Sequence, residues 1–218
     1  MAATPSTRRV GTVAEVLNRI GSIPIARIRP VPPPGEATEE DVVAIHRKER
    51  RLYELVEGVL VEKVMGAYES YLAMVLARLL GNFIEQHALG ILLGEAGMLR
   101  LSTGLLRIPD LSFVSWGRLP EDRLLAEPVL NLSPDLAVEV ISRGNTTEEM
   151  DRKLIEYFEA GVALVWYVDP AEKTVTVFTS PEHSTVLHEE EILDGGAVLP
   201  GFHLPLHGLF DAPRPRGH

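Results

Sequence analysis

Two acidic side chains lie where the sequence is otherwise apolar. Asp110 follows Pro109 at the start of an apolar stretch, and Glu139 lies inside the apolar run at 136–141. Ionised carboxylates are costly among apolar residues unless they are paired or bind a metal. Carboxylate oxygens suit Mg²⁺ or Mn²⁺ better than zinc, and the sequence has no HExxH or paired-histidine pattern that would form a competing site. The two acids therefore indicate a divalent-metal site.

An alternative is open for the same acids. Buried carboxylates are also neutralised by arginines, and Arg107, Arg143 and Arg152 are the candidates for such pairing. In that case the chain would be an interaction protein without chemistry of its own. For isolated acids, ion pairing is the more frequent explanation.

A lysine lies on the helix expected after the Glu139 strand. Glu149, Lys153 and Tyr157 are spaced by four residues, which places them on one face of that helix. A lysine beside carboxylates can orient or deprotonate water. Spacing alone favours a simpler interpretation, in which Lys153 and Glu149 form a surface ion pair that contributes roughly a few tenths of a kcal/mol.

The elements that must position these residues follow from periodicity. A stripe of apolar residues from Tyr68 to His87 predicts a long helix that covers a sheet and ends at Gly90. Thr146 and Glu149 form a capping box for a helix over 146–160. Strands are predicted within 52–64 (a hairpin around Gly58), 90–101, 105–114, 135–142, 163–169 and 173–178. The fold class is therefore α/β or α+β, a mixed central sheet flanked by helices.

The first fifty residues differ from the rest. Short helices are predicted over 13–20 and from Thr38 to Arg51, separated by a proline-rich extended linker. We expect an N-terminal extension (1–50), a main domain (51–211) and a short tail (212–218).

Composition excludes several classes of protein. The 218 residues are 45% hydrophobic and 24% charged, as in soluble globular proteins. The absence of cysteine rules out disulfides, thiolate metal sites and a cysteine nucleophile. We expect a cytoplasmic protein without membrane contact, because the sequence lacks both a secretory signal pattern and an apolar run long enough to span a bilayer. The net charge of −10 argues against a broad phosphate-binding surface.

Four segments in order resemble a known family. They are YELVEG at 53–58, RIPDLSFV at 107–114, LAVEVIS at 136–142 and EEMDRKLIEYFEAGVALVWYVDP at 148–170. Together they resemble the Uma-two family of restriction-endonuclease-like proteins, within the PD-(D/E)xK nuclease superfamily. The resemblance covers roughly 52–210. It implies a restriction-endonuclease-like fold and a Mg²⁺-dependent or Mn²⁺-dependent endonuclease that hydrolyses DNA.

The resemblance also implies roles for individual residues. Asp110 corresponds to the aspartate of the PD motif and Glu139 to the acid of the (D/E)xK motif, both as metal ligands. The position two residues after Glu139 is Ile141 rather than lysine, so Lys153 is expected to supply the lysine from the following helix. The backbone carbonyl of Ile141 is expected to add a further metal ligand. Glu54 corresponds to an early acid of the family and is the fourth expected catalytic residue.

DNA contact is expected from the basic N-terminal region. Its members are Arg8, Arg9, Arg47, Lys48, Arg50 and Arg51. The resemblance implies a homodimer, since many nucleases of the superfamily cut two strands as dimers. A catalytically silent relative that binds nucleic acid or protein is the alternative, because a fold does not secure a function.

Overall fold

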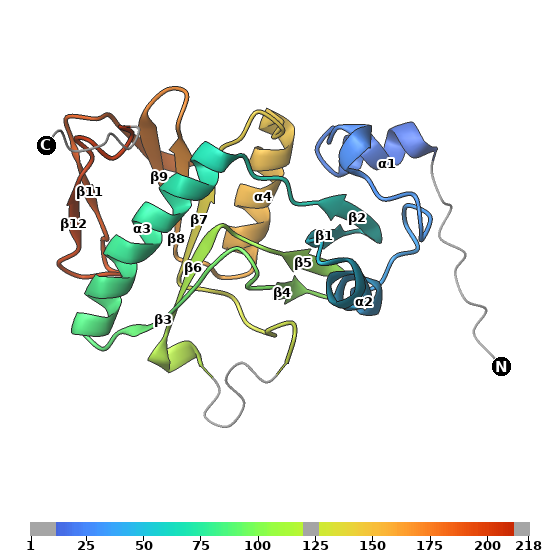
Figure 1. Ribbon diagram of the computed structural model, residues 1–218, viewed down its shortest axis with the longest axis horizontal. Helices are drawn as coiled ribbons and strands as arrows, with labels where there is room; N and C mark the ends of the chain where they lie inside the picture. Colours follow the sequence, from blue (N-terminus) through green and yellow to red (C-terminus); the bar gives the residue numbers. More distant parts are fainter. Residues whose placement is uncertain (1–11, 120–126, 212–218) are drawn as a thin grey trace, which may run out of the picture.

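The computed structural model describes residues 12–119 and 127–211, which form a six-stranded sheet, a four-stranded sheet and a two-stranded hairpin, with helices packed against them (Figure 1). Its α-helices are α1 (Val13–Arg19), α2 (Glu39–Glu49), α3 (Ala67–Gln86) and α4 (Thr147–Glu159). Two 3₁₀ turns span Ile25–Arg27 and Trp116–Arg118. Arg8, Arg9 and the expected tail lie outside the described residues.

The larger sheet has six strands in the order β10-β9-β8-β7-β6-β3. Its strands are β3 (Gly90–Leu93), β6 (Leu111–Ser115), β7 (Leu136–Val140), β8 (Leu164–Asp169), β9 (Thr174–Ser180) and β10 (His183–Leu187). β7 and β8 are parallel and the other pairs are antiparallel. The predicted mixed sheet flanked by helices is thus confirmed.

The smaller sheet has four antiparallel strands in the order β2-β1-β5-β4. They are β1 (Tyr53–Val56), β2 (Val59–Glu62), β4 (Leu99–Ser102) and β5 (Leu105–Arg107). A short hairpin of β11 (Ile192–Asp194) and β12 (His203–Pro205) follows the large sheet in the chain. The hairpin predicted around Gly58 is formed by β1 and β2.

Alternation along β7 decides which helix each of its side chains meets. Leu136, Val138 and Val140 belong to the core cluster that includes α3. Ala137 lies in the cluster that includes α4 on the other face. Because successive side chains of a strand point to opposite faces, Glu139 faces α4. The predicted apolar strand therefore carries one acid, aimed at the helix that follows it.

The predicted strand over 105–114 is two strands in two different sheets. β5 ends at Arg107 in the small sheet, and β6 begins at Leu111 in the large sheet. Pro109 has no N–H and cannot continue a ladder, so the chain leaves one sheet at this point and enters the other. The predicted strand over 90–101 divides in the same way, into β3 and β4. The sequence periodicity was right about extended structure and wrong about its continuity.

The N-terminal segments cover the small sheet. Val42 and Ile45 of α2 pack with Leu55 on one face, while Val16 and Ile20, at α1, pack with the Val56 side of the sheet. The long helix predicted over 68–87 is α3, which ends at Gln86, and Gly90, expected to end it, is the first residue of β3. His183–Leu187 forms the exposed strand β10 at one edge of the large sheet.

Candidate active site

Asp110 lies where the chain passes between the two sheets. Its side chain is buried, and its Oδ2 accepts a hydrogen bond of 2.6 Å from the N–H of Val140. The side-chain oxygen thus serves as the hydrogen-bond acceptor for the last residue of β7, just before β6 begins. Asp110 is thereby fixed next to the C-terminal end of the strand that holds Glu139.

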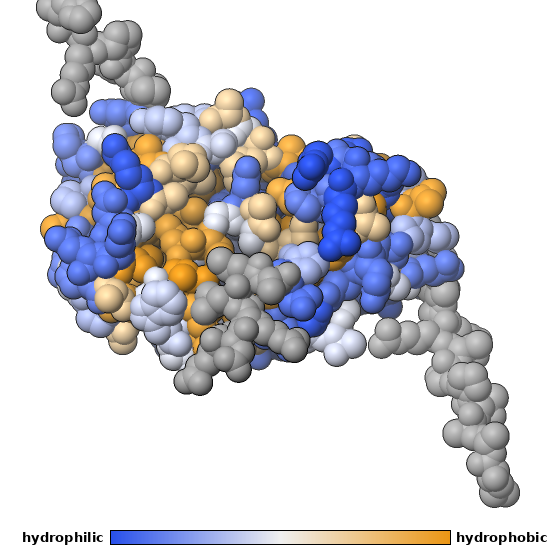
Figure 2. Space-filling model, turned by 60° about the horizontal axis from the view of Figure 1, so that its bottom comes forward, coloured by the Kyte–Doolittle hydropathy of each residue, from blue (hydrophilic) through white to orange (hydrophobic). Residues whose placement is uncertain are grey.

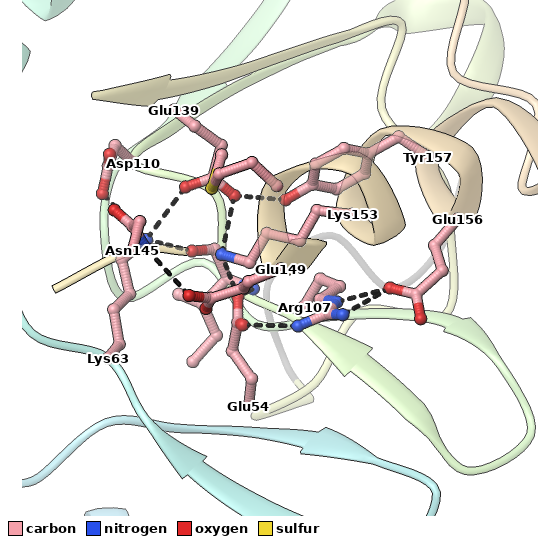
Figure 3. A network of polar contacts seen from close by, with 12 residues as sticks. Glu54, Lys63, Arg107, Asp110, Glu139, Asn145, Glu149, Lys153, Glu156 and Tyr157 are labelled. Atoms are coloured by element: carbon pink, nitrogen blue, oxygen red, sulfur yellow. Dashed lines mark hydrogen bonds and ion pairs between the residues drawn. The ribbon is translucent and has the colours of Figure 1, made fainter. Parts of the chain in front are cut away.

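Glu139 meets two side chains of α4, as Figure 3 shows. Tyr157 donates a hydrogen bond of 2.6 Å to its Oε1, and the ammonium of Lys153 lies 3.1 Å from the same oxygen. Lys153 also lies 3.2 Å from Oε1 of Glu54. The expected surface pair of Lys153 with Glu149 was wrong, because α4 turns Lys153 into the interior toward Glu139 and Glu54.

Glu54 reaches the site from β1 and is held by an arginine. Arg107 donates to Oε2 of Glu54 at 2.7 Å, and the N–H of Ile108 donates to Oε1 at 3.1 Å. The same guanidinium donates to Oε2 of Glu156 on α4 at 2.8 and 2.5 Å. The alternative of arginine partners for Asp110 and Glu139 was wrong, because these two acids contact Lys63 and Lys153, and Arg107 pairs instead with Glu54 and Glu156.

Lys63 was not among the residues expected at the site. Its ammonium lies 2.8 Å from Oδ1 of Asp110 and 3.6 Å from Oε2 of Glu139, and it also donates to the carbonyl of Ile108. The side chain is 9% exposed. A lysine therefore lies between the two acids that the sequence assigned to a metal.

The wall of the site is completed from the N-terminal segment. Arg27 donates to both carboxylate oxygens of Glu149, at 2.7 and 2.9 Å, and to the carbonyl of Gly144. Thr146 accepts from the N–H of Glu149 as predicted, but Arg27 takes the Glu149 carboxylate, so the reciprocal half of the capping box is missing. Residues before the expected main domain thus contact the helix that bears Lys153.

Two hollows adjoin these residues. A cavity of about 20 Å³ is lined by Glu54, Lys63, Asp110, Glu139 and Lys153, with Arg27, Val64, Met65, Val140 and Asn145. A larger cleft of about 600 Å³ has a mostly apolar lining and runs from Asp110 along α3 and the connection between β3 and β4. Apolar side chains gather in a hollowed area of the face seen in Figure 2.

Comparison with known proteins matches these observations. A family model named Uma2 and described as "Putative restriction endonuclease" matches residues 39–207. The chain belongs to the Uma2 family. A crystal structure described as a putative nuclease belonging to DUF820, from Anabaena variabilis ATCC 29413, has a TM-score of 0.66 and 19% sequence identity to the chain. The alignment covers 73% of this chain and 89% of that one, and it shows a shared fold. No match is found among the curated proteins.

The family expected from the motifs is thus confirmed, and it is a family of restriction-endonuclease-like nucleases. Within this Uma2 chain, the structure brings together Asp110, Glu139, Lys153 and Glu54. Ile141 lies just beyond β7, and its N–H donates to the carbonyl of Val168. Val140 rather than Ile141 lines the small cavity.

Four of the six basic residues expected to contact DNA lie in the described part of the chain, at the end of α2 and just after it. Arg47 and Lys48 are exposed in the last turn of α2, and Arg50 follows as its cap. Arg51 pairs with Glu62 at 2.5 Å. None of the described helices combines the length and hydropathy needed to cross a bilayer.

Burial and neighbouring charges shift the pKa values of the cluster in opposite directions. Burial by itself would raise the pKa of Glu54, but Lys153 and Arg107 outweigh it and hold that pKa well below its ordinary value. Burial raises the pKa of Asp110, against the opposing effect of Lys63. Burial and the neighbouring Glu139 raise the pKa of Tyr157 far above its ordinary value. Its hydroxyl therefore keeps its proton and donates a hydrogen bond to Glu139.

Sequence reasoning missed Lys63, Arg27 and, as a member of the site, Glu156. Lys63 follows the buried strand β2 directly, and a lysine at the end of an apolar strand was the available signal. Arg27 lies in the proline-rich segment, where nothing in the local pattern indicates a partner more than a hundred residues away. Those contacts depend on tertiary structure alone.

Proposed function

We propose that the chain is a Mg²⁺-dependent or Mn²⁺-dependent endonuclease that hydrolyses phosphodiester bonds of DNA. The observation that supports this most directly is the convergence of Asp110 and Glu139 from adjacent strands, with Lys153 in contact with Glu139. Membership of a restriction-endonuclease-like family supports the same reaction class.

The donor set fits a hard divalent cation. Oδ1 of Asp110 and Oε2 of Glu139 both face one cationic atom, the ammonium nitrogen of Lys63. Within the described residues, no group of three or more His, Cys, Asp and Glu side chains is arranged to hold a metal. Two carboxylates, a backbone carbonyl from Ile141 or Val140, and water would make up the coordination that Mg²⁺ prefers. Asp110 and Glu139 are the side chains that would hold it.

The chain's own residues prepare the reaction. A bound divalent ion supplies a Lewis acid for the phosphate and acidifies the attacking water. Lys153 holds positive charge beside Glu139, where it offsets the negative charge that develops on the phosphate. Tyr157 fixes the orientation of Glu139, and Glu54 fixes that of Lys153. Arg107 in turn keeps Glu54 ionised and in place.

Further parts of the proposal concern partners and boundaries. Arg47, Lys48, Arg50 and Arg51 are proposed to contact the DNA backbone, and a homodimer is proposed for cutting both strands. The division into an extension (1–50), a nuclease domain (51–211) and a tail (212–218) also stays a proposal.

A second candidate is a catalytically silent module of the same fold. It is favoured by one observation: Glu54, Asp110 and Glu139 each contact a cationic side chain of the protein itself. Such a cluster can be stable without chemistry.

Nicking of supercoiled plasmid at low salt separates the two candidates. The wild type is expected to nick DNA with Mg²⁺ or Mn²⁺ and not with a chelator, and Asp110→Ala and Glu139→Ala are expected to abolish nicking. Lys153→Ala is expected to lower the rate about 10²- to 10³-fold. Lys173→Ala, which removes an exposed lysine paired with Glu189, is the matched control and should nick like the wild type. A folded wild type that never nicks with either metal favours the silent module.

A further inference from the structure

Lys63 lies on the short connection between β2 and α3, residues 63–66. Its backbone is anchored, because its N–H donates to the carbonyl of Leu52. Its side chain turns inward, whereas the next residue, Val64, is exposed. The backbone is therefore fixed while the ammonium sits at the end of a flexible four-carbon stem.

The ammonium contacts the same two acids that would hold a metal. It lies 2.8 Å from Oδ1 of Asp110 and 3.6 Å from Oε2 of Glu139. Mg²⁺ binds oxygens at about 2.1 Å and usually keeps several waters. The adjoining cavity has a volume of about 20 Å³, room for about one water molecule. A hydrated divalent ion and the Lys63 ammonium therefore compete for one space.

Charge leads to the same conclusion. The three carboxylates of Glu54, Asp110 and Glu139 are in contact with three cationic groups, those of Lys63, Lys153 and Arg107. Arg107 and Lys153 both contact Glu54, whereas Lys63 is the cation that contacts both Asp110 and Glu139. A divalent ion added to this balanced set would leave two excess positive charges in a buried site, and withdrawal of Lys63 would halve that excess.

We propose that Lys63 is a built-in counter-cation that holds Asp110 and Glu139 together before metal binds and must be displaced when metal enters. Lys63 is thus a positioning residue that sets the metal affinity of the site. This inference rests on the proposed function, since it concerns the same metal site.

Mn²⁺ binding by the full-length protein tests the inference by titration calorimetry. Lys63→Met removes the charge at similar length, and Lys63→Gln keeps a polar end in case the methionine variant fails to fold. Both are expected to bind Mn²⁺ about 10- to 100-fold more tightly than the wild type, because no charged hydrogen bond has to be broken first. Lys173→Met is the matched control and should bind like the wild type.

A second readout is the temperature of unfolding, measured first without metal and then with it. In chelator, both Lys63 variants are expected to unfold at lower temperature than the wild type, because Asp110 and Glu139 are left facing each other. Mn²⁺ is then expected to raise their unfolding temperature by more than it raises that of the wild type.

The outcomes separate this inference from the proposed function. Unchanged or weaker Mn²⁺ binding in both Lys63 variants, with binding retained by the wild type, overturns the inference and leaves the metal site standing. Binding that appears only in the Lys63 variants supports the inference and shows a wild-type site closed by its own lysine. If the wild type and the variants all fail to bind Mn²⁺, the metal-dependent function is wrong and the inference with it.

Discussion

Arg107 donates hydrogen bonds to Glu54 on one side and to Glu156 on the other, and it is completely buried. The pair of contacts joins β1 and β5 of the small sheet to α4, which packs on the large sheet. Glu156 also accepts a hydrogen bond of 2.6 Å at its Oε1 from Nε of Arg152. The position of Lys153 on α4 relative to Glu54 on β1 thus depends on an ion pair in the interior.

Arg107→Met is expected to destabilise the protein by about 3–5 kcal/mol, because two buried carboxylates each lose a charged partner. Urea unfolding measures the loss. Arg100→Met, which breaks the more exposed pair with Glu39, is the control and is expected to cost less than about 1 kcal/mol. Equal losses for the two variants would show that the buried position of Arg107 has no special weight.

Tyr157→Phe is expected to cost about 1.5–3 kcal/mol, since it removes a buried hydrogen bond to a carboxylate. Tyr167→Phe is the matched control, because the Tyr167 hydroxyl donates at 2.7 Å to the neutral carbonyl of Met150. That loss is expected to be about 0.5–1.5 kcal/mol. Chemical denaturation measures both. The orienting role given to Tyr157 also predicts slower plasmid nicking for Tyr157→Phe alone, and equal nicking by the two variants would contradict it.

The Arg27–Glu149 pair predicts a pH dependence. Burial by itself would raise the pKa of Glu149, but its hydrogen bonds with Arg27 outweigh this and the pKa lies below the ordinary value of 4.5. The folded protein therefore binds this proton less readily than the unfolded chain does. The stabilisation is complete above pH 4.5 and is lost as the pH falls below it.

Glu149→Gln tests this pH dependence. The variant is expected to be about 3 kcal/mol less stable than the wild type at neutral pH, with a difference that narrows as the pH falls through 4.5. Urea unfolding at a series of pH values measures the difference. Glu189→Gln alters an exposed pair with Lys173 and should show a small difference throughout. A Glu149→Gln difference that stays constant with pH would contradict the ion-pair account.

The sequence predicted the elements that carry Glu139 and Lys153. A strand and the helix after it were both expected, because the strand and helix periodicities are visible in the sequence. Their adjacency required a second condition, that α4 covers the face of β7 to which Glu139 points. That condition is a property of packing, and the surface-pair interpretation of Lys153 failed for lack of it.

Other features depended on contacts between distant segments. Lys63 and Arg27 meet Asp110 and Glu149 across long stretches of chain, and no local period encodes such meetings. The passage of the chain from β5 to β6 was hidden for a different reason. Strands of both sheets are equally apolar, so only Pro109 marked the change of sheet.

Asp110 has two roles, because its carboxylate accepts a hydrogen bond from the backbone of Val140 in the sheet and is also a proposed metal ligand. Replacing it with a residue that accepts no hydrogen bond removes a sheet contact together with a ligand. Descendants of this protein under no pressure to cut DNA would therefore still be selected to keep an acceptor at position 110. Lys153 contributes no such ladder bond, so its loss would act through the buried charges of Glu54 and Glu139 rather than through the sheet.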